Sequence, residues 1–258
     1  MLVWLVLILV HYLVPAAPFA GSIAKSRSFK AFSSRKITRN CCRLGAAESD
    51  QDPYTSFSLA EKVLFNRFAA SVAVELGNEI VVPAKNYGEL MAQINVMSSC
   101  PDIASINAKG KAMLVRLFPR WLLMQYKWMF AAPFPRFSAW MNAWVTRFAT
   151  QWLMGESVVV DIDLPDGTVG KSMGLKIDKC RFLEEAGCVK TCLHACKVPT
   201  QDFFHEEMGL PVTLKPDMET KSCEFHFGVA PLPLTEDPIA ASPCFTACSK
   251  ASRSIKCM

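Results

Sequence analysis

Cysteine is concentrated near the C-terminal end of the chain. Eight of the eleven cysteines lie within the last 79 residues. A chain that uses cysteine this densely builds disulfides, holds a metal or carries out redox chemistry, and the cellular compartment usually decides among these uses. We therefore expect the chemistry of the chain in this region. The eight are Cys180, Cys188, Cys192, Cys196, Cys223, Cys244, Cys248 and Cys257.

The first 47 residues have the composition of a two-part targeting leader. Residues 2–14 form an apolar run that ends at Pro15 and several small residues, as in a secretory signal peptide. Residues 22–47 carry seven basic residues and no acidic residue, interleaved with serine and threonine, which is typical of a transit peptide. We predict a signal peptide at residues 1–21 and a transit peptide at residues 22–47. Together they form the address of a plastid protein delivered through the secretory route.

Two other interpretations of the leader remain open. A permanent membrane anchor is disfavoured because the apolar run has only about thirteen residues, whereas a spanning helix needs about 20. The leader also has the composition expected of an ordinary secreted protein with a signal peptide and a basic pro-segment. In that case the cysteines would pass through an oxidising compartment and could form disulfides.

Removal of the leader changes the net charge of the chain. The full sequence has 28 basic and 23 acidic residues, and seven of the basic residues lie in the leader. The chain from Glu48 onward therefore has 21 basic and 23 acidic residues, a net charge of −2. This charge gives no support to nucleic-acid binding as a general property. The roughly 210 remaining residues are enough for one sizeable core.

An acid-free, aromatic segment precedes the cysteines. From Ile103 to Gly155 there is no Asp or Glu, although seven Lys or Arg and eleven aromatic residues are present. Helical spacing within it predicts one apolar stripe. Such a helix either lies in a membrane interface, where aromatic rings and cations meet lipid headgroups, or faces a protein core. The core-facing interpretation is favoured because most such helices in proteins face a core. The membrane interpretation is favoured by the absence of acidic residues, since the solvated faces of soluble helices normally carry both signs of charge. The stripe consists of Phe137, Trp140, Met141, Trp144, Phe148 and Trp152.

The remaining pattern predicts an α+β fold. A capping box at Ser58 and Glu61 opens the first of several helices. Residues 158–162 and 169–177 flank a Pro-Asp-Gly-Thr sequence and predict a strand, a turn and a strand. We expect a mainly helical region at residues 48–177 that ends in this hairpin, then a cysteine-rich region of helix and strand at residues 178–258. The helices are expected at residues 59–76, 86–97 and 105–118.

The cysteine-rich region contains a long block of specific motifs. The matching positions are Cys180-Arg-Phe-Leu-Glu184, Gly187-Cys188, Cys192, Cys196-Lys197, Pro199-Thr-Gln201, Phe203-Phe204, Gly209-Leu-Pro211, Pro216, Ser222-Cys223-Glu224, Gly228, Asp237-Pro238, Pro243-Cys244 and Cys248. Through them the chain resembles the plastid β-carotene cis/trans isomerases of strigolactone biosynthesis, the dwarf-type isomerases. The resemblance is close over residues 178–257 and loose over residues 54–177. The chain departs from the family at Lys190, where the family favours glycine, and at His194, where it favours asparagine.

The resemblance implies an enzyme that isomerises a carotenoid double bond, all-trans to 9-cis for β-carotene in the type members, in an iron-containing plastid protein. A conjugated double bond rotates readily only when its bond order is lowered, and one-electron chemistry at a cofactor would lower it. The cysteines are the natural place to look for that iron. A carotenoid must also be taken from a membrane, which would give the acid-free segment a peripheral role at the plastid membrane surface.

Spacing limits how the cysteines could hold iron. Cys188, Cys192 and Cys196 are four residues apart, so on a continuous helix the outer two would lie about 12 Å apart, too far for one small cluster. Either Cys188 precedes the helix and folds back, or only Cys192 and Cys196 share a face. The family match adds Cys223. The predicted iron ligands are therefore Cys188, Cys192, Cys196 and Cys223, as a mononuclear or iron–sulfur site, and no catalytic residue is assigned.

Alternatives to this iron isomerase remain open. Four disulfides or a closed zinc site would use the cysteines for stability alone, although a reducing plastid stroma favours free thiols. The chain could also be a non-catalytic plastid protein of the same fold that binds carotenoid or metal. A secreted disulfide protein without enzymatic function is the third possibility.

Overall fold

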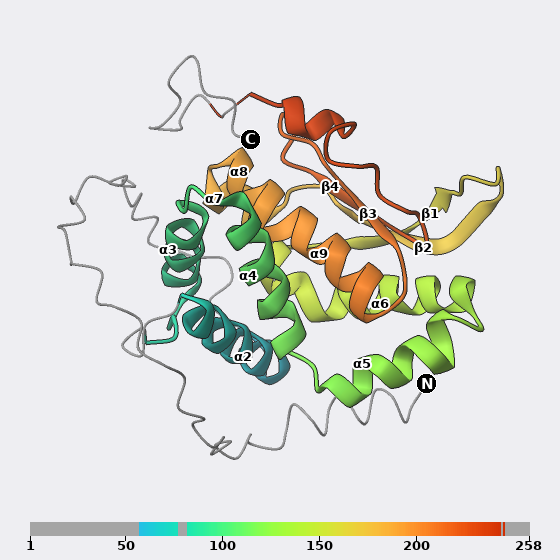
Figure 1. Cartoon of the computed structure of the whole chain (residues 1–258), viewed down its shortest axis with the longest axis horizontal. Coiled ribbons are helices and arrows are strands. Elements are labelled where there is room, and N and C mark those ends of the chain that lie inside the picture. The colour runs from blue at the N-terminus through green and yellow to red at the C-terminus, as the bar shows by residue number, and fades with distance from the viewer. Residues whose placement is uncertain (1–56, 77–81, 244, 246–258) are drawn as a thin grey trace, which may run out of the picture. The chain divides into compact units, whose positions relative to one another are not determined.

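The computed structural model describes residues 57–76, 82–243 and 245, and Figure 1 shows the course of the chain. These described residues belong to one compact unit. The predicted leader at residues 1–47 lies outside the described residues, as do Cys244, Cys248 and Cys257. Helices and a small antiparallel sheet confirm the predicted α+β fold class.

Helices make up the first part of this unit. The three predicted at residues 59–76, 86–97 and 105–118 are confirmed with ends that differ by one or two residues, and the helix carrying the aromatic stripe is also present. In chain order the elements are α2 (Leu59–Glu75), α3 (Tyr87–Ser98), α4 (Ile103–Arg116), α5 (Arg120–Tyr126), the π-helical segment η1 (Lys127–Ala131) and α6 (Pro135–Met154).

Side chains at the helix starts explain where the first three helices begin. Ser58 accepts a hydrogen bond from the backbone N–H of Glu61, and the Glu61 carboxylate accepts one from the backbone N–H of Ser58. The predicted capping box is therefore confirmed. Asn86 and Asp102 in the same way accept bonds from amides in the first turns of α3 and α4. These bonds satisfy donors that a helix start otherwise leaves unpaired.

The second part contains the sheet and the cysteine-bearing helices. Strands β1 (Val158–Asp163) and β2 (Val169–Ile177) form the predicted hairpin. The segments α8, η2, α9 and η3 follow one another without a break, and η2 and η3 are π-helical. The later elements are α7 (Arg181–Ala186), α8 (Val189–Thr191), η2 (Cys192–Lys197), α9 (Val198–Asp202), η3 (Phe203–Glu207), β3 (Val212–Pro216), β4 (Cys223–Phe227) and the 3₁₀ segment η4 (Pro238–Ala241).

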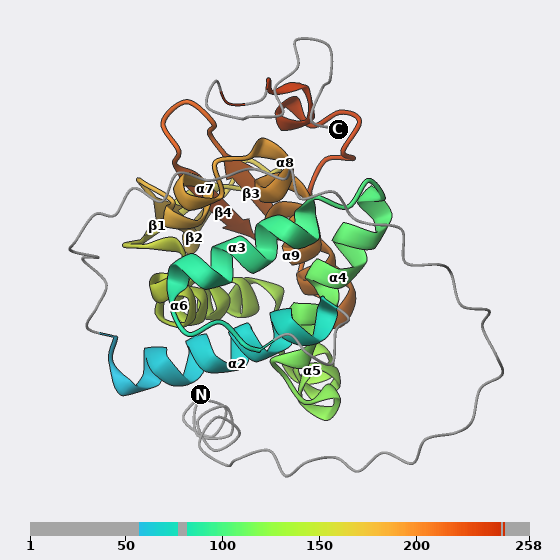
Figure 2. The same cartoon turned by 90° about the vertical axis from the view of Figure 1, so that its left-hand side faces the viewer.

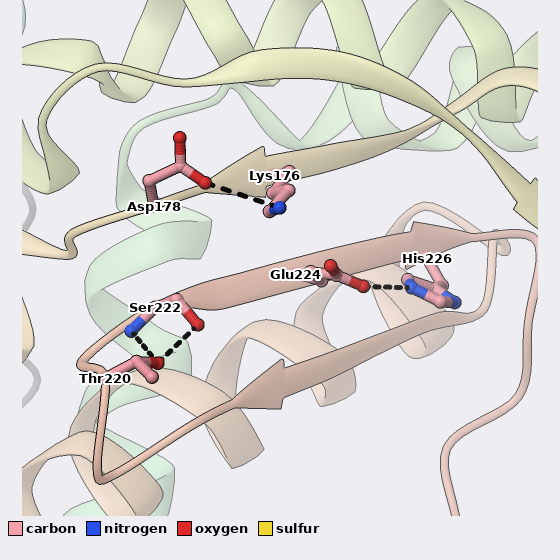
Figure 3. Close-up of polar contacts among 6 residues, drawn as sticks. All are labelled: Lys176, Asp178, Thr220, Ser222, Glu224 and His226. Atoms are coloured by element: carbon pink, nitrogen blue, oxygen red, sulfur yellow. Dashed lines mark hydrogen bonds and ion pairs between the residues drawn. The ribbon is translucent and has the colours of Figure 1, made fainter.

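The sheet joins the two predicted regions of the chain. Its four antiparallel strands have the order β1-β2-β4-β3, so β2 pairs with β4 across about fifty residues of sequence. One face is apolar and carries the buried residues Leu175, Leu214 and Phe225. Polar side chains occupy the other face. Figure 3 shows there the pairs Lys176 with Asp178 and Glu224 with His226, and in the turn before β4 Thr220 with Ser222.

Helix α6 packs against the sheet through small side chains. Ala139 and Ala143, one helical turn apart, are both 0% exposed. The Cβ atom of Ala139 lies 3.6 Å from the position that a Cβ would take at Gly228, which follows β4. Helix α6 contacts β1, β2 and β4 and also α2, whereas α3 and α4 pack on α2 and on the helical run from α8 to η3 (Figures 1 and 2). This close approach requires small residues, because larger ones would hold the helix away from the sheet.

A second close approach joins α4 to the cysteine-bearing helices. A Cβ placed at Gly110 would lie 2.6 Å from Cγ of Pro199 in α9. Because real Cβ contacts are longer than this, Gly110 is required by packing and not by its backbone conformation. The contact fixes the distance between α4 and the helical run that contains Cys192 and Cys196.

We predict that Gly110→Ala destabilises the protein by about 1–3 kcal/mol, because the strain of overpacking outweighs the higher helix propensity of alanine. The free energy of unfolding measured by urea titration checks this. Gly88→Ala in α3 is the matched control, since its nearest neighbouring atom would lie at an ordinary 3.6 Å. That variant should be neutral or more stable by roughly 0.5 kcal/mol. Equal effects of the two substitutions would contradict the close packing of α4 on α9.

Candidate functional site

Four cysteines from three separate segments line one small buried cavity. Its volume is about 10 Å³, close to what a single water molecule needs. The four cysteines come from the start of α7, from η2 and from the start of β4. Apolar side chains and one lysine complete the wall. The full lining is Met154, Cys180, Phe182, Leu183, Cys192, Cys196, Lys197, Leu214, Pro216, Cys223 and Phe225.

Secondary structure explains how the four thiols meet. Cys192 and Cys196 both belong to the π-helical segment η2, so the alternative in which these two share a face holds. π-helical turns are rare and often mark functional sites. Cys223 opens β4 on the apolar face of the sheet, where it pairs with Ile177 of β2. Cys180 precedes α7, and its backbone N–H donates to the carbonyl of Lys221, which brings it back to the start of β4.

The structure places the four predicted iron ligands unevenly. Cys192, Cys196 and Cys223 lie together at the cavity, whereas Cys188 does not line it. Cys188 is half-buried and stands before α8, directly after Gly187, whose φ of 55° ends α7. Cys180 takes the fourth position at the cavity. Cys180 was not among the predicted ligands because it lies outside the four-residue spacing of the other cysteines in this segment. It does open the longest family motif.

Burial keeps these thiols protonated. The pKa of Cys196 is raised to about 12, mainly by burial and in smaller part by the neighbouring Cys180. The pKa values of Cys192 and Cys223 lie well above the ordinary thiol value, first because of burial and then because of the other cysteines. The Lys197 ammonium lowers these last two pKa values without offsetting the burial. Neutral thiols are poor nucleophiles and poor metal ligands, so ionisation here needs an added cation.

A buried ion pair closes one side of the cavity. Lys197 at the end of η2 pairs with Asp237, and their side chains are 4% and 11% exposed. The second carboxylate oxygen of Asp237 accepts a hydrogen bond from the backbone N–H of Ile239, so both oxygens are used. A buried pair of this kind is costly to break, because either partner alone would leave an uncompensated charge. The ammonium of Lys197 is therefore fixed next to the thiols.

The thiols as placed do not form a metal site. In residues 57–76, 82–243 and 245, no group of three or more Cys, His, Asp or Glu side chains is positioned to hold a metal ion. The six cysteines described there are free thiols, and two of them, Cys100 and Cys180, lie outside the predicted ligand set. Thiols are a suitable type of ligand for iron, but the described thiols are not positioned around a single metal site. The described geometry therefore supports no reaction step that uses iron.

His194 lies outside the cavity although it sits in the same π-helical segment. Its Nδ1 is 3.1 Å from Oδ1 of Asn107 in α4, and its ring is buried. Burial lowers the pKa of His194, and the Lys190 ammonium lowers it further, so the imidazole is neutral. No hydrogen-bond partner of Nε2 exists among the described residues. His194 therefore joins α4 to η2, and no catalytic role is assigned to it.

A second hollow is larger and more open. It has a volume of about 540 Å³ and lies along the C-terminal half of α4 up to the start of α5. Its basic residues are Lys111, Arg116 and Arg120, and Lys111 forms ion pairs with Glu206 and Glu207. None of the predicted site residues contributes to it. No motif predicts this hollow, because its walls consist of ordinary helix positions.

We predict that Cys223→Ser lowers the free energy of unfolding by about 1–3 kcal/mol, because a hydroxyl in the apolar cavity would lack a hydrogen-bond partner. Cys188→Ser is the matched control, since Cys188 is half-buried and stands outside the cavity. It should cost less than about 0.5 kcal/mol. Urea titration of both variants measures the difference. Similar losses for the two would mean that Cys188 belongs to the buried cluster.

Comparison with known proteins identifies the region that contains the cavity. Residues 152–236 match the family model described as beta-carotene isomerase D27-like, C-terminal. This range covers the sheet, α7 and the π-helical segments η2 and η3, with all four cysteines of the cavity. The family resemblance predicted from the sequence is therefore confirmed for this part of the chain. No solved structure gives a significant match.

Two curated relatives match over similar lengths. The chain is 37% identical over 118 residues to the beta-carotene isomerase D27, chloroplastic, of Arabidopsis thaliana, covering 46% of this chain and 44% of that protein. It is 38% identical over 108 residues to the protein of the same name from Medicago truncatula, covering 42% of each chain. The chain thus spans less than half the length of the curated relatives it matches. Both relatives are described as chloroplastic.

Proposed function

We propose, because residues 152–236 are a D27-like C-terminal domain, that this chain is a carotenoid cis/trans isomerase. The observation that carries the proposal is the identity of 37% to a beta-carotene isomerase over 118 residues. The range that the family model matches, residues 152–236, includes the four cysteines of the cavity. Within the proposal, the substrate is all-trans-β-carotene or a related carotenoid, and the product is a 9-cis form.

The reaction requires a lower barrier to rotation about one double bond of the polyene. Addition or removal of one electron, or protonation of the chain, would lower the bond order of that double bond. Such chemistry needs an environment without water, because water would quench a charged or radical polyene. The apolar surroundings of the cysteine cavity meet this condition, although the cavity itself is too small for a carotenoid.

The proposal includes iron as a cofactor held by the cysteines. Its support is chemical: buried thiols with raised pKa values become thiolates when a metal cation joins them, and thiolates are common ligands of iron. The ligands proposed from the sequence are Cys188, Cys192, Cys196 and Cys223. Cys180 is the alternative to Cys188 because it lines the cavity. Binding would require the thiols to move closer together than they are in the described structure.

The proposal also places the protein at the plastid membrane surface, where carotenoids are found. None of the helices in the described part of the chain combines the length and apolarity that a bilayer span requires. The association would therefore be peripheral. Delivery by a signal peptide at residues 1–21 and a transit peptide at residues 22–47 belongs to the same proposal.

Expression in bacteria that accumulate all-trans-β-carotene tests the isomerase proposal. The chain from Glu48 onward keeps the compact unit whole. We expect the 9-cis fraction of β-carotene, measured by chromatography, to rise above that of an empty-vector control. Cys192→Ala should abolish the rise, and Cys100→Ala, outside the cavity, should retain it. An unchanged isomer profile in cells with soluble, folded protein would contradict the proposal and favour the carotenoid-binding alternative.

Metal analysis of protein purified without oxygen tests the iron proposal. We expect about one or more iron atoms per chain, released on acidification because protonated thiols bind metal weakly. Cys223→Ser should lose the iron. A comparison of Cys188→Ser with Cys180→Ser then identifies the fourth ligand. Folded protein that contains no iron and has all its thiols free would rule out the cofactor while leaving the isomerase proposal to its own test.

A further inference from the structure

An exposed aromatic face covers α5, η1 and α6. Of the described large apolar side chains that are exposed to solvent, half belong to residues 120–148. Trp128 is 82% exposed and Phe148 is 67% exposed. Exposed aromatic residues in this number are unusual on a soluble surface and mark an interaction site. We define the aromatic face as Trp121, Met124, Trp128, Met129, Phe134, Phe137 and Phe148.

Helix α6 turns its large side chains outward and its small ones inward. Ala139 and Ala143 contact the sheet side, whereas Phe137 and Phe148 lie on the opposite side of the helix. Part of the predicted stripe does serve the core, since Trp152 is buried and contacts Phe68 of α2 with ring centroids 5.7 Å apart. Met141, near the centre of the stripe, is also buried, and Trp140 and Trp144 are half-buried. The core-facing interpretation therefore explains Met141 and Trp152, whereas Phe137 and Phe148 face outward.

Ring contacts join the aromatic side chains on this side into two groups. Phe130 of η1 lies 6.3 Å from Phe137, and Phe137 lies 5.7 Å from Trp140, measured between ring centroids. Trp144 and Phe148, further along α6, form the second group with centroids 6.4 Å apart. Helix α6 contacts η1, and η1 follows α5 directly along the chain. The face therefore extends from the η1 turn along the outer side of α6.

The charge on this face has one sign. No Asp or Glu occurs between residues 103 and 155, and the basic residues on α5, η1 and α6 are Arg120, Lys127, Arg136 and Arg147. The guanidinium of Arg147 lies 5.7 Å from the ring centroid of Trp144 and 5.9 Å from that of Phe148. Neither Arg120 nor Arg147 forms an ion pair in the part of the chain that the structure describes. Arg136 instead pairs with Asp166 at the β1–β2 turn.

We propose that the aromatic face docks into the interfacial region of a lipid bilayer that carries anionic headgroups. Tryptophan and phenylalanine side chains settle at the boundary between headgroups and acyl chains, and arginine next to them reaches the anionic lipid phosphates. A second copy of the chain is a poorer occupant. A symmetric dimer through this face would bring together two faces that both carry only positive charge.

The docking inference goes beyond the isomerase proposal and fixes which side of the protein meets the membrane. The π-helical turn with Trp128 would enter the lipid first, because it is the most exposed part of the face. The sheet would face away from the membrane, since α6 separates it from the aromatic face. The hollow along α4 ends at Arg120, next to Trp121 of the face, so it would open close to the lipid surface.

Flotation with lipid vesicles tests the inference on the chain from Glu48 onward, which lacks the apolar leader but keeps the compact unit. The vesicles consist of phosphatidylcholine with or without phosphatidylglycerol. The face variant combines Trp128→Ser with Phe148→Ser. The matched control combines Val96→Ser with Leu232→Ser, which are 67% and 56% exposed and lie outside the face. A third variant combines Arg120→Gln with Arg147→Gln. Circular dichroism verifies that all four proteins are folded.

We expect the unchanged chain to float with anionic vesicles, and the face variant to bind at least about tenfold more weakly because two large apolar side chains are removed. The control variant should stay within about twofold of the unchanged chain, since single exposed residues away from an interface contribute little. The arginine variant, and the unchanged chain at high salt, should lose several-fold in binding, because surface electrostatic attraction is screened.

Three results would overturn the inference. The first is a folded chain that does not float with anionic vesicles. The second is binding that the face variant and the control variant reduce equally. The third is a dimer in size-exclusion chromatography that the face variant dissociates, with no vesicle binding, which would assign the face to a second copy. The assay uses no carotenoid, so the isomerase proposal and this inference can fail separately.

Discussion

The contact between helix α6 and the sheet determines how the other elements are arranged. Ala139 and Ala143 let the helix approach closely, next to Gly228 at the end of β4. With its small residues inward, α6 must present its large residues elsewhere: Trp152 towards α2, and Phe137 and its neighbours towards the outside. The same helix ends at Met154, which lines the cysteine cavity. The close packing of α6 on the sheet therefore positions both the candidate site and the aromatic face.

The cysteine cavity combines two opposing requirements. Burial of Cys192, Cys196 and Cys223 stabilises the fold through apolar contact and at the same time raises the pKa values of their thiols. The buried Lys197 ammonium acts in the opposite direction on Cys192 and Cys223, but its charge is shared with Asp237. The thiols thus remain neutral and close together. The thiols of such a site lose their protons only when a cation binds there, so their ionisation depends on cation binding.

Local signals predicted local structure well. The Ser58 capping box, the three helices that begin the unit and the β1–β2 hairpin depend on side chains within a few residues of each other, and the structure confirms them. The resemblance carried by the motif block from Cys180 onward is confirmed in the region where the family model matches. Here the information was contained in long, specific motifs and not in periodicity.

Features that depend on contacts between residues far apart in the sequence could not be predicted from spacing or periodicity. Cys180 reaches the cavity only because β4 pairs with β2 and returns the chain to it, which no spacing rule reveals. The close approach of Gly110 to Pro199 joins residues far apart in the sequence. Periodicity identified the aromatic stripe of α6 without showing that the alanines opposite it face the sheet.

The ion pair between Lys197 and Asp237 also joins residues far apart in the sequence, and it affects the order in which the elements fold. Asp237 can lose its hydration favourably only once η2 has presented a buried ammonium, so the segment that contains η4 should dock after the helices have formed and should be the first part of the unit to detach.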